Sequence, residues 1–274
     1  MNIETKNKVE EHLREVMKRI LEKRTIQEPF NEEDIKNKNP FGYRLVPIEV
    51  WKGSKFERSF VTSLGQGIFE QIAKIIAEGS GAIAENQYTK SIKLNSWQLE
   101  KIDNILEKQR KQRNASKKKV KDNSNKVKTI NEELEFLREL ETDRYQEVSV
   151  LFDLYIKREN GMEEYYSLKT VKPNLDQTET AKKDMLRLMT AEENSEAYFA
   201  LPYNPAGEGE IYKLAHSIPY KLFDMDNDSN VLIGKKLWDK IGQDDDTYDE
   251  LLEIFNKVGE EYVYKIKKEY LGID

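Results

Sequence analysis

The feature that most restricts the fold is a pair of apolar runs joined by a short polar turn. The first run, residues 147–156, is rich in β-branched and aromatic side chains, which predicts a buried strand. Residues 158–161, Arg-Glu-Asn-Gly, follow it, and Asn-Gly tolerates the positive φ angles that a tight hairpin requires. Residues 164–171 predict the returning strand, which Pro173 ends. The chain must therefore build a sheet around this hairpin.

Helical periodicity surrounds the hairpin on both sides, because apolar residues recur at steps of three and four. The predicted helices are residues 1–25, 59–78, 97–109, 132–140, 181–190, 235–241 and 248–270. A further strand is predicted at residues 197–201 and another is possible at 211–214, whereas several prolines predict an irregular connection over 26–51. These elements favour an α/β (α+β) fold with a mixed central β-sheet flanked by helices.

The composition excludes several kinds of chemistry. The 274 residues include no cysteine and two histidines, which excludes disulfides, thiol catalysis and multi-histidine metal sites. Acidic residues are abundant, and carboxylates with water are the ligands that hard cations such as Mg²⁺ prefer. No apolar stretch approaches the length of a membrane span, and the charged N-terminus lacks the apolar region of a secretory signal. We therefore expect a cytoplasmic protein that does not interact with membranes.

The chain is long enough for one large domain or two small ones. We predict a single domain over residues 1–274, with an N-terminal helix at 1–25 and a basic mobile segment at about 108–128. That segment holds ten basic residues and one acid. A solvated loop explains this composition, and the alternative is an arm whose Lys117, Lys118 and Lys119 contact DNA phosphates.

One carboxylate stands out because it interrupts the most apolar run of the chain. Burying Asp153 there is costly unless the side chain is paired, protonated or bound to a cation. On the returning strand, Ser167 and Lys169 are two residues apart and point to the same face. The hairpin should bring Asp153 and Lys169 together, either as a functional pair or as a structural salt bridge.

An aspartate on one strand and a lysine on the next resembles the active site of the PD-(D/E)XK nucleases. The resemblance implies that Asp153 binds Mg²⁺ and that Lys169 serves the attacking water and the scissile phosphate. Ser167 stands where that pattern has a second acid, so this acid must come from elsewhere. In several restriction endonucleases of this fold an N-terminal helix supplies it, which implicates Glu70 as a second metal ligand. Two acids after Lys169 are the alternatives, Glu179 and Asp184.

Two longer blocks resemble the type II restriction endonucleases typified by TdeIII. They are residues 52–73, which contain Arg-Ser-Phe-Val-Thr-Ser-Leu-Gly, and residues 168–174, Leu-Lys-Thr-Val-Lys-Pro-Asn. Residues 234–242 are also similar, so the resemblance covers about residues 40 to 270. It implies a restriction-endonuclease-like fold and a Mg²⁺-dependent homodimer that uses no nucleotide cofactor. Such an enzyme cuts double-stranded DNA at a short palindrome, with GGNCC as the family expectation.

The same blocks suggest which residues contact DNA. Lys172 and Asn174 follow the predicted catalytic strand, where they suit phosphate or base contacts or simply a turn around Pro173. Arg58, with Ser59 and Ser63, suits the DNA backbone, although Ser63 equally fits an ordinary helix N-cap.

Two other functions remain compatible with the sequence. One is a non-specific or structure-selective nuclease of the same fold, for which a monomer would be evidence because a palindromic site calls for a two-fold dimer. The other is a catalytically silent DNA-binding protein in which Asp153 and Lys169 form only a salt bridge.

Overall fold

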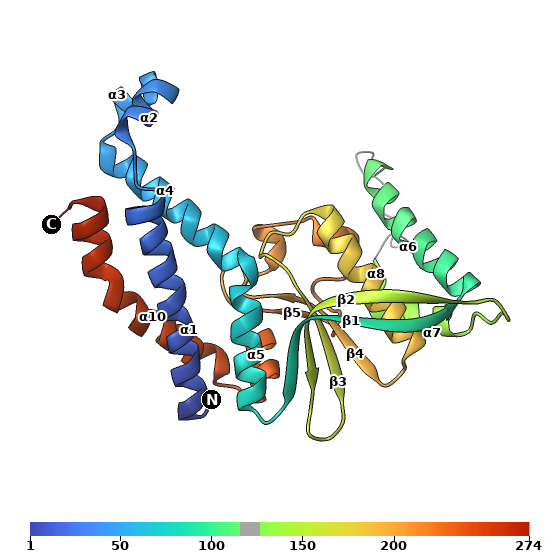
Figure 1. Cartoon of the computed structure of the whole chain (residues 1–274). Coiled ribbons are helices and arrows are strands. Elements are labelled where there is room, and N and C mark those ends of the chain that lie inside the picture. The colour runs from blue at the N-terminus through green and yellow to red at the C-terminus, as the bar shows by residue number, and fades with distance from the viewer. Residues whose placement is uncertain (116–126, 274) are drawn as a thin grey trace. The chain divides into compact units, whose positions relative to one another are not determined.

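A computed structural model describes residues 1–115 and 127–273, and Figure 1 shows their helices and strands. The chain divides into two compact units, which we call the helical unit (Met1–Ile76 with Asp246–Asp274) and the sheet unit (Ala77–Asp245). The single domain over residues 1–274 stays a prediction. Lys117, Lys118 and Lys119 of the predicted basic segment lie outside the described residues.

The helical unit is built from helices that begin and end at recognisable signals. Its elements are α1 (Ile3–Glu22) with a π-helical turn (Lys23–Gln27), α2 (Glu32–Lys38), α3 (Pro40–Leu45), α4 (Ile48–Ser63) with a π-helical turn (Leu64–Ile68), the start of α5 (Phe69–Gly79), and α10 (Thr247–Tyr264) with a last turn (Lys265–Leu271). The apolar faces of α1 and α10 pack together. Arg14 of α1 also makes a two-pronged ion pair with Glu261 of α10.

Two predictions about this unit are wrong. Residues 26–51 are largely helical rather than irregular, because Pro40 and Pro47 stand at helix starts, where a missing N–H costs nothing. Asn31 and Asn39 cap α2 and α3 by accepting backbone N–H bonds. Ser63 is not an N-cap, because α4 begins far upstream at Ile48 and the chain continues through Ser63 into a further helical turn.

The sheet unit contains a five-stranded sheet, whose order is β1-β2-β3-β4-β5 in the described residues. The strands are β1 (Ile83–Asn95), β2 (Tyr145–Lys157), β3 (Glu163–Leu168), β4 (Ser195–Leu201) and β5 (Val231–Ile233). The first two pairings are antiparallel and the last two are parallel. This arrangement confirms the predicted mixed sheet and the β2–β3 hairpin. Strands β1 and β5 were not predicted.

Helices flank this sheet, as expected. They are α6 (Ser96–Ala115), α7 (Ile130–Arg138), α8 (Leu175–Ala191) and α9 (Lys235–Gly242). The possible strand at residues 211–214 is wrong, because the chain makes a short 3₁₀ turn (Tyr212–Leu214) there. No helix among the described residues is both long enough and apolar enough to cross a membrane.

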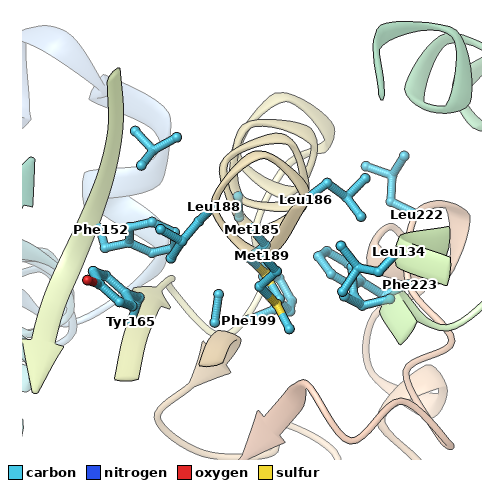
Figure 2. Packing of buried hydrophobic residues seen from close by; sticks show 14 of the residues in the cluster. Leu134, Phe152, Tyr165, Met185, Leu186, Leu188, Met189, Phe199, Leu222 and Phe223 are labelled. Carbon is cyan, nitrogen blue, oxygen red and sulfur yellow. The ribbon is translucent and has the colours of Figure 1, made fainter. Parts of the chain in front are cut away.

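Helix α8 is the centre of the main core. Figure 2 shows Leu188 on the side of Phe152, and Leu186 on the side of Leu222 and Phe223. Lys182 of α8 is fully buried and pairs with the buried Glu133 of α7 at 2.7 Å. These contacts pack α8 against the sheet on one side and against α7 on the other.

A second buried charge cluster holds the turn of the β2–β3 hairpin. Glu164 accepts hydrogen bonds from Arg158 Nε and Nη2 at 3.0 and 2.7 Å, and from the Tyr166 hydroxyl at 2.8 Å. Arg158 also donates to the backbone carbonyls of Lys240 and Ile241 at the end of α9. Both charged side chains are 3% exposed, and Arg158 depends on Glu164 for compensation, while Glu164 also has Lys240 Nζ at 3.5 Å.

Candidate active site

The β2–β3 hairpin brings Asp153 and Lys169 together, as its turn predicted. The strands pair from Leu154–Tyr166 to Lys157–Glu163, and Gly161 closes the turn with φ +85°. Lys169 comes one residue after β3 and its Nζ lies 2.7 Å from Asp153 Oδ2. The two side chains are 20% and 16% exposed, so solvent still reaches the pair.

Asp153 lies where the regular alternation of β2 is interrupted. Phe152 and Tyr155 belong to the same core cluster although they are three residues apart, which an unbroken strand cannot achieve. Directly across, on β1, Gln87 has φ +55°, a conformation that costs a non-glycine residue free energy. Gln87 Nε2 approaches Asp153 Oδ1 at 3.4 Å. Distortions of this kind re-aim side chains next to active sites.

Gln87 is a site residue that sequence reasoning missed. Its strand was not predicted, because residues 83–91 are mostly polar and lack a run of β-branched or aromatic side chains. Nothing in the local sequence signals the positive φ angle, which becomes visible only once β1 and β2 are paired.

A second carboxylate lies near the pair on α8. Burial raises the pKa of Asp184, and this effect is partly offset by the positive charges of Arg187 and Lys169 and by a hydrogen bond from the Leu151 backbone N–H. Asp184 was one of the two alternatives for the second acid. The other, Glu179, forms a 2.7 Å ion pair with Arg110 of α6.

Glu70 lies in the first turn of α5 and belongs to the helical unit, whereas Asp153 and Lys169 belong to the sheet unit. Its predicted role as the second metal ligand stays a prediction. Among the described residues no group of three or more His, Cys, Asp or Glu side chains could hold a metal ion. One or two carboxylates completed by water and substrate oxygens still suit Mg²⁺, and Asp153 offers oxygens of that hard type.

The loop after β3 is held on both sides of Lys172. The Tyr212 hydroxyl donates to the Val171 carbonyl, and His216 Nε2 lies 2.8 Å from the Pro173 carbonyl. Lys172 itself is exposed, so its ammonium is presented from a fixed backbone. Asn174 caps α8 through its side-chain oxygen, which accepts the Gln177 N–H. The cap uses the side-chain oxygen of Asn174, and its predicted contact with DNA stays a prediction.

The remaining predicted contacts lie on α4. Arg58 is exposed there. Ser59 is buried, and its hydroxyl accepts from Arg24 Nε and donates to the Lys55 carbonyl. Because its only O–H is donated to the Lys55 carbonyl, Ser59 has no donor left for a phosphate oxygen and supports Arg24 instead.

A mixed sheet flanked by helices, with an Asp–Lys pair on its central hairpin, is consistent with a restriction-endonuclease-like fold. Residues 5–259 match the family model of the type II restriction endonuclease HinfI. The chain therefore belongs to the HinfI family of type II restriction endonucleases, whose members are site-specific deoxyribonucleases.

Three relatives from Herpetosiphon aurantiacus agree with this assignment. The type II restriction enzyme HgiCII is 31% identical over 85% of this chain and 81% of its own length. The type II restriction enzymes HgiEI and HgiBI are each 30% identical, over 80% of this chain and 77% of their own lengths.

Proposed function

We propose that this enzyme cleaves double-stranded DNA at a short palindrome in a Mg²⁺-dependent reaction at the Asp153–Lys169 pair. The observation that carries the proposal is the 2.7 Å contact between these two side chains on the central hairpin. The TdeIII resemblance supplies GGNCC as the expected site, and the Asp and Lys positions suggest membership of the PD-(D/E)XK superfamily. We also propose a homodimer, since its symmetry would match the palindrome, and a cytoplasmic location, where the DNA is.

The chemistry follows from the two side chains. Bound Mg²⁺ would make its coordinated water a better nucleophile and offset charge on the phosphate. Asp153 would supply the anionic oxygen that holds the cation, and the second acid would be Glu70, Asp184 or Glu179. Lys169 orients the attacking water and stabilises negative charge that develops on the phosphate oxygens. The water oxygen would lose a proton to solvent and form a bond to phosphorus, while the bond from phosphorus to the leaving oxygen breaks and that oxygen takes up a proton from solvent.

Removal of divalent metal is expected to abolish cleavage. Phage-length duplex DNA is incubated with the enzyme in Mg²⁺ or in EDTA, and the fragment ends are mapped by sequencing. Discrete Mg²⁺-dependent fragments that share one end motif would support the proposal and give the recognition site. A smear would instead indicate a non-specific or structure-selective nuclease, and equal cleavage in EDTA would contradict the role of metal.

The identity of the second acid is tested by comparing Glu70→Gln with Asp184→Asn. Loss of a metal ligand is expected to lower the single-turnover cleavage rate at least about a hundredfold and to raise the Mg²⁺ concentration needed for half-maximal rate, because ligand charge sets metal affinity. The substitutions at the other acids should change the rate only a few-fold. Glu179→Gln is tested beside them as the third candidate, and Asp176→Asn is the matched control, because Asp176 is an exposed acid of α8 that pairs with Arg110. Wild-type Mg²⁺ dependence in all three candidate variants would refute all three assignments.

A further inference from the structure

We infer that a basic cleft in the helical unit binds the phosphodiester backbone of the DNA substrate. The cleft lies between the end of α1 and the second half of α4 and has a volume of about 490 Å³. Five cations line it, namely Arg19, Lys23, Arg24, Lys55 and Arg58. Arg58 was predicted to contact DNA from the sequence, whereas the other four cations were not.

Charge is the first argument for a phosphate ligand. Five of the lining residues are cations and none is an acid, in a chain whose net charge is −6. Within the described residues no carboxylate lies within 4 Å of Arg19 or Arg58, and both side chains are exposed. The positive charges of Arg19 and Arg58 therefore have no carboxylate beside them, and an anionic ligand would offset the repulsion among the cations of the cleft.

The construction of the cleft is the second argument. Its floor is apolar, since Val16, Ile20 and Ile68 are each no more than 5% exposed. Arg24 is 11% exposed and is held by Ser59 and by Glu28, whose carboxylate lies 3.2 Å from Nη1. This Arg is therefore fixed in place before any ligand arrives.

The other groups at the rim suit the same ligand. Lys55 is steadied by the Pro29 carbonyl at 3.2 Å. Glu28 also lies 3.9 Å from Lys23, so one acid at the edge offsets part of the positive charge. Hydroxyl groups of Thr62 and Ser63 add neutral donors of the type that contact phosphate oxygens. Duplex DNA is the source of phosphate that a restriction enzyme meets, and these contacts would position it without reading its sequence.

The inference rests on DNA cleavage as the function, and the double variant Arg19→Gln/Arg58→Gln tests it. Duplex binding is measured in metal-free buffer across a range of KCl concentrations. We expect the Kd at about 150 mM salt to rise at least about tenfold, and the slope of log K against log salt to fall by about two, one for each lost phosphate contact. Cleavage lost at low DNA concentration should be recovered as DNA concentration is raised, because KM changes more than kcat.

Lys8→Gln/Lys18→Gln is the matched control, because it removes two positive charges from exposed positions of α1 outside the cleft. Unchanged affinity and slope in the cleft variant, or equal losses in both variants, would overturn the inference. Inorganic phosphate that competes with DNA at micromolar concentration would also overturn it, by showing a site for the free anion. A wild-type protein that binds DNA but cuts without metal would refute the proposed chemistry and leave this binding test intact.

Discussion

Replacing Asp153 with asparagine is expected to lower the cleavage rate by at least about a thousandfold. The variant keeps the size of the side chain but loses the negative charge that faces Lys169 and is proposed to hold Mg²⁺. Several kcal/mol of transition-state stabilisation depend on a catalytic metal, and each 1.36 kcal/mol is a factor of ten in rate. Single-turnover cleavage of a duplex that carries the recognition site measures the loss.

Two comparisons separate a catalytic role from a structural one. Binding of DNA in metal-free buffer should stay within about threefold of wild type, because the fold and the cationic surfaces are untouched. Asp143→Asn, at an exposed position two residues before β2, is the control and should cut normally. A D153N enzyme that cuts at a near wild-type rate would reduce the Asp153–Lys169 contact to a structural salt bridge.

Replacing Glu164 with glutamine is expected to destabilise the sheet unit by about 3–5 kcal/mol. The change leaves Arg158 buried with no negative partner at 2.7 Å. Urea unfolding followed by tryptophan fluorescence suits this test, because Trp238 is 1% exposed inside the same unit. The midpoint should shift to lower urea concentration.

The neighbouring turn residue gives the matched control for this prediction. Glu159 is exposed, and Glu159→Gln should change the free energy of unfolding by less than about 0.5 kcal/mol. If E164Q matched this control, the buried cluster would contribute little, and the hairpin would owe its stability to backbone pairing and to the packing of its aromatic residues.

The parts of the fold that could be predicted are those specified by neighbouring residues. Strands β2 and β3 and their turn follow from a β-branched run, an Asn-Gly pair and a returning run. Most of the longer helices follow from apolar periodicity, whereas α2 and α3 are short and have no buried face, so no such pattern marks them. Strand β5 has only three residues and exists because β4 supplies its partners, so its own sequence carries little signal.

The candidate site divides in the same way. Asp153 and Lys169 are joined by a hairpin, so their contact follows from the turn alone. Gln87 reaches Asp153 from β1, and Asp184 of α8 lies near enough for the charge of Lys169 to offset part of the rise in pKa that burial causes; no local pattern specifies either position. Ser167 stands where the nuclease pattern has an acid, so the sequence shows that the second acid must come from another element. It does not show which residue that is.

The pairing of β1 with β2 has a consequence for the order in which the site is assembled. The β2–β3 hairpin closes over a short turn, whereas β1 pairs with β2 from Asn95–Tyr145 to Ile83–Lys157, with all of α6 and α7 between them in sequence. Bringing β1 and β2 together closes a long loop and lowers the conformational entropy of the chain before stabilising contacts have formed. Pairings between distant segments therefore form slowly. During synthesis on the ribosome β1 emerges first, but it cannot pair until β2 has also been synthesised. We therefore expect the Asp153–Lys169 pair to form early, and Gln87 to reach Asp153 only in the last steps of folding.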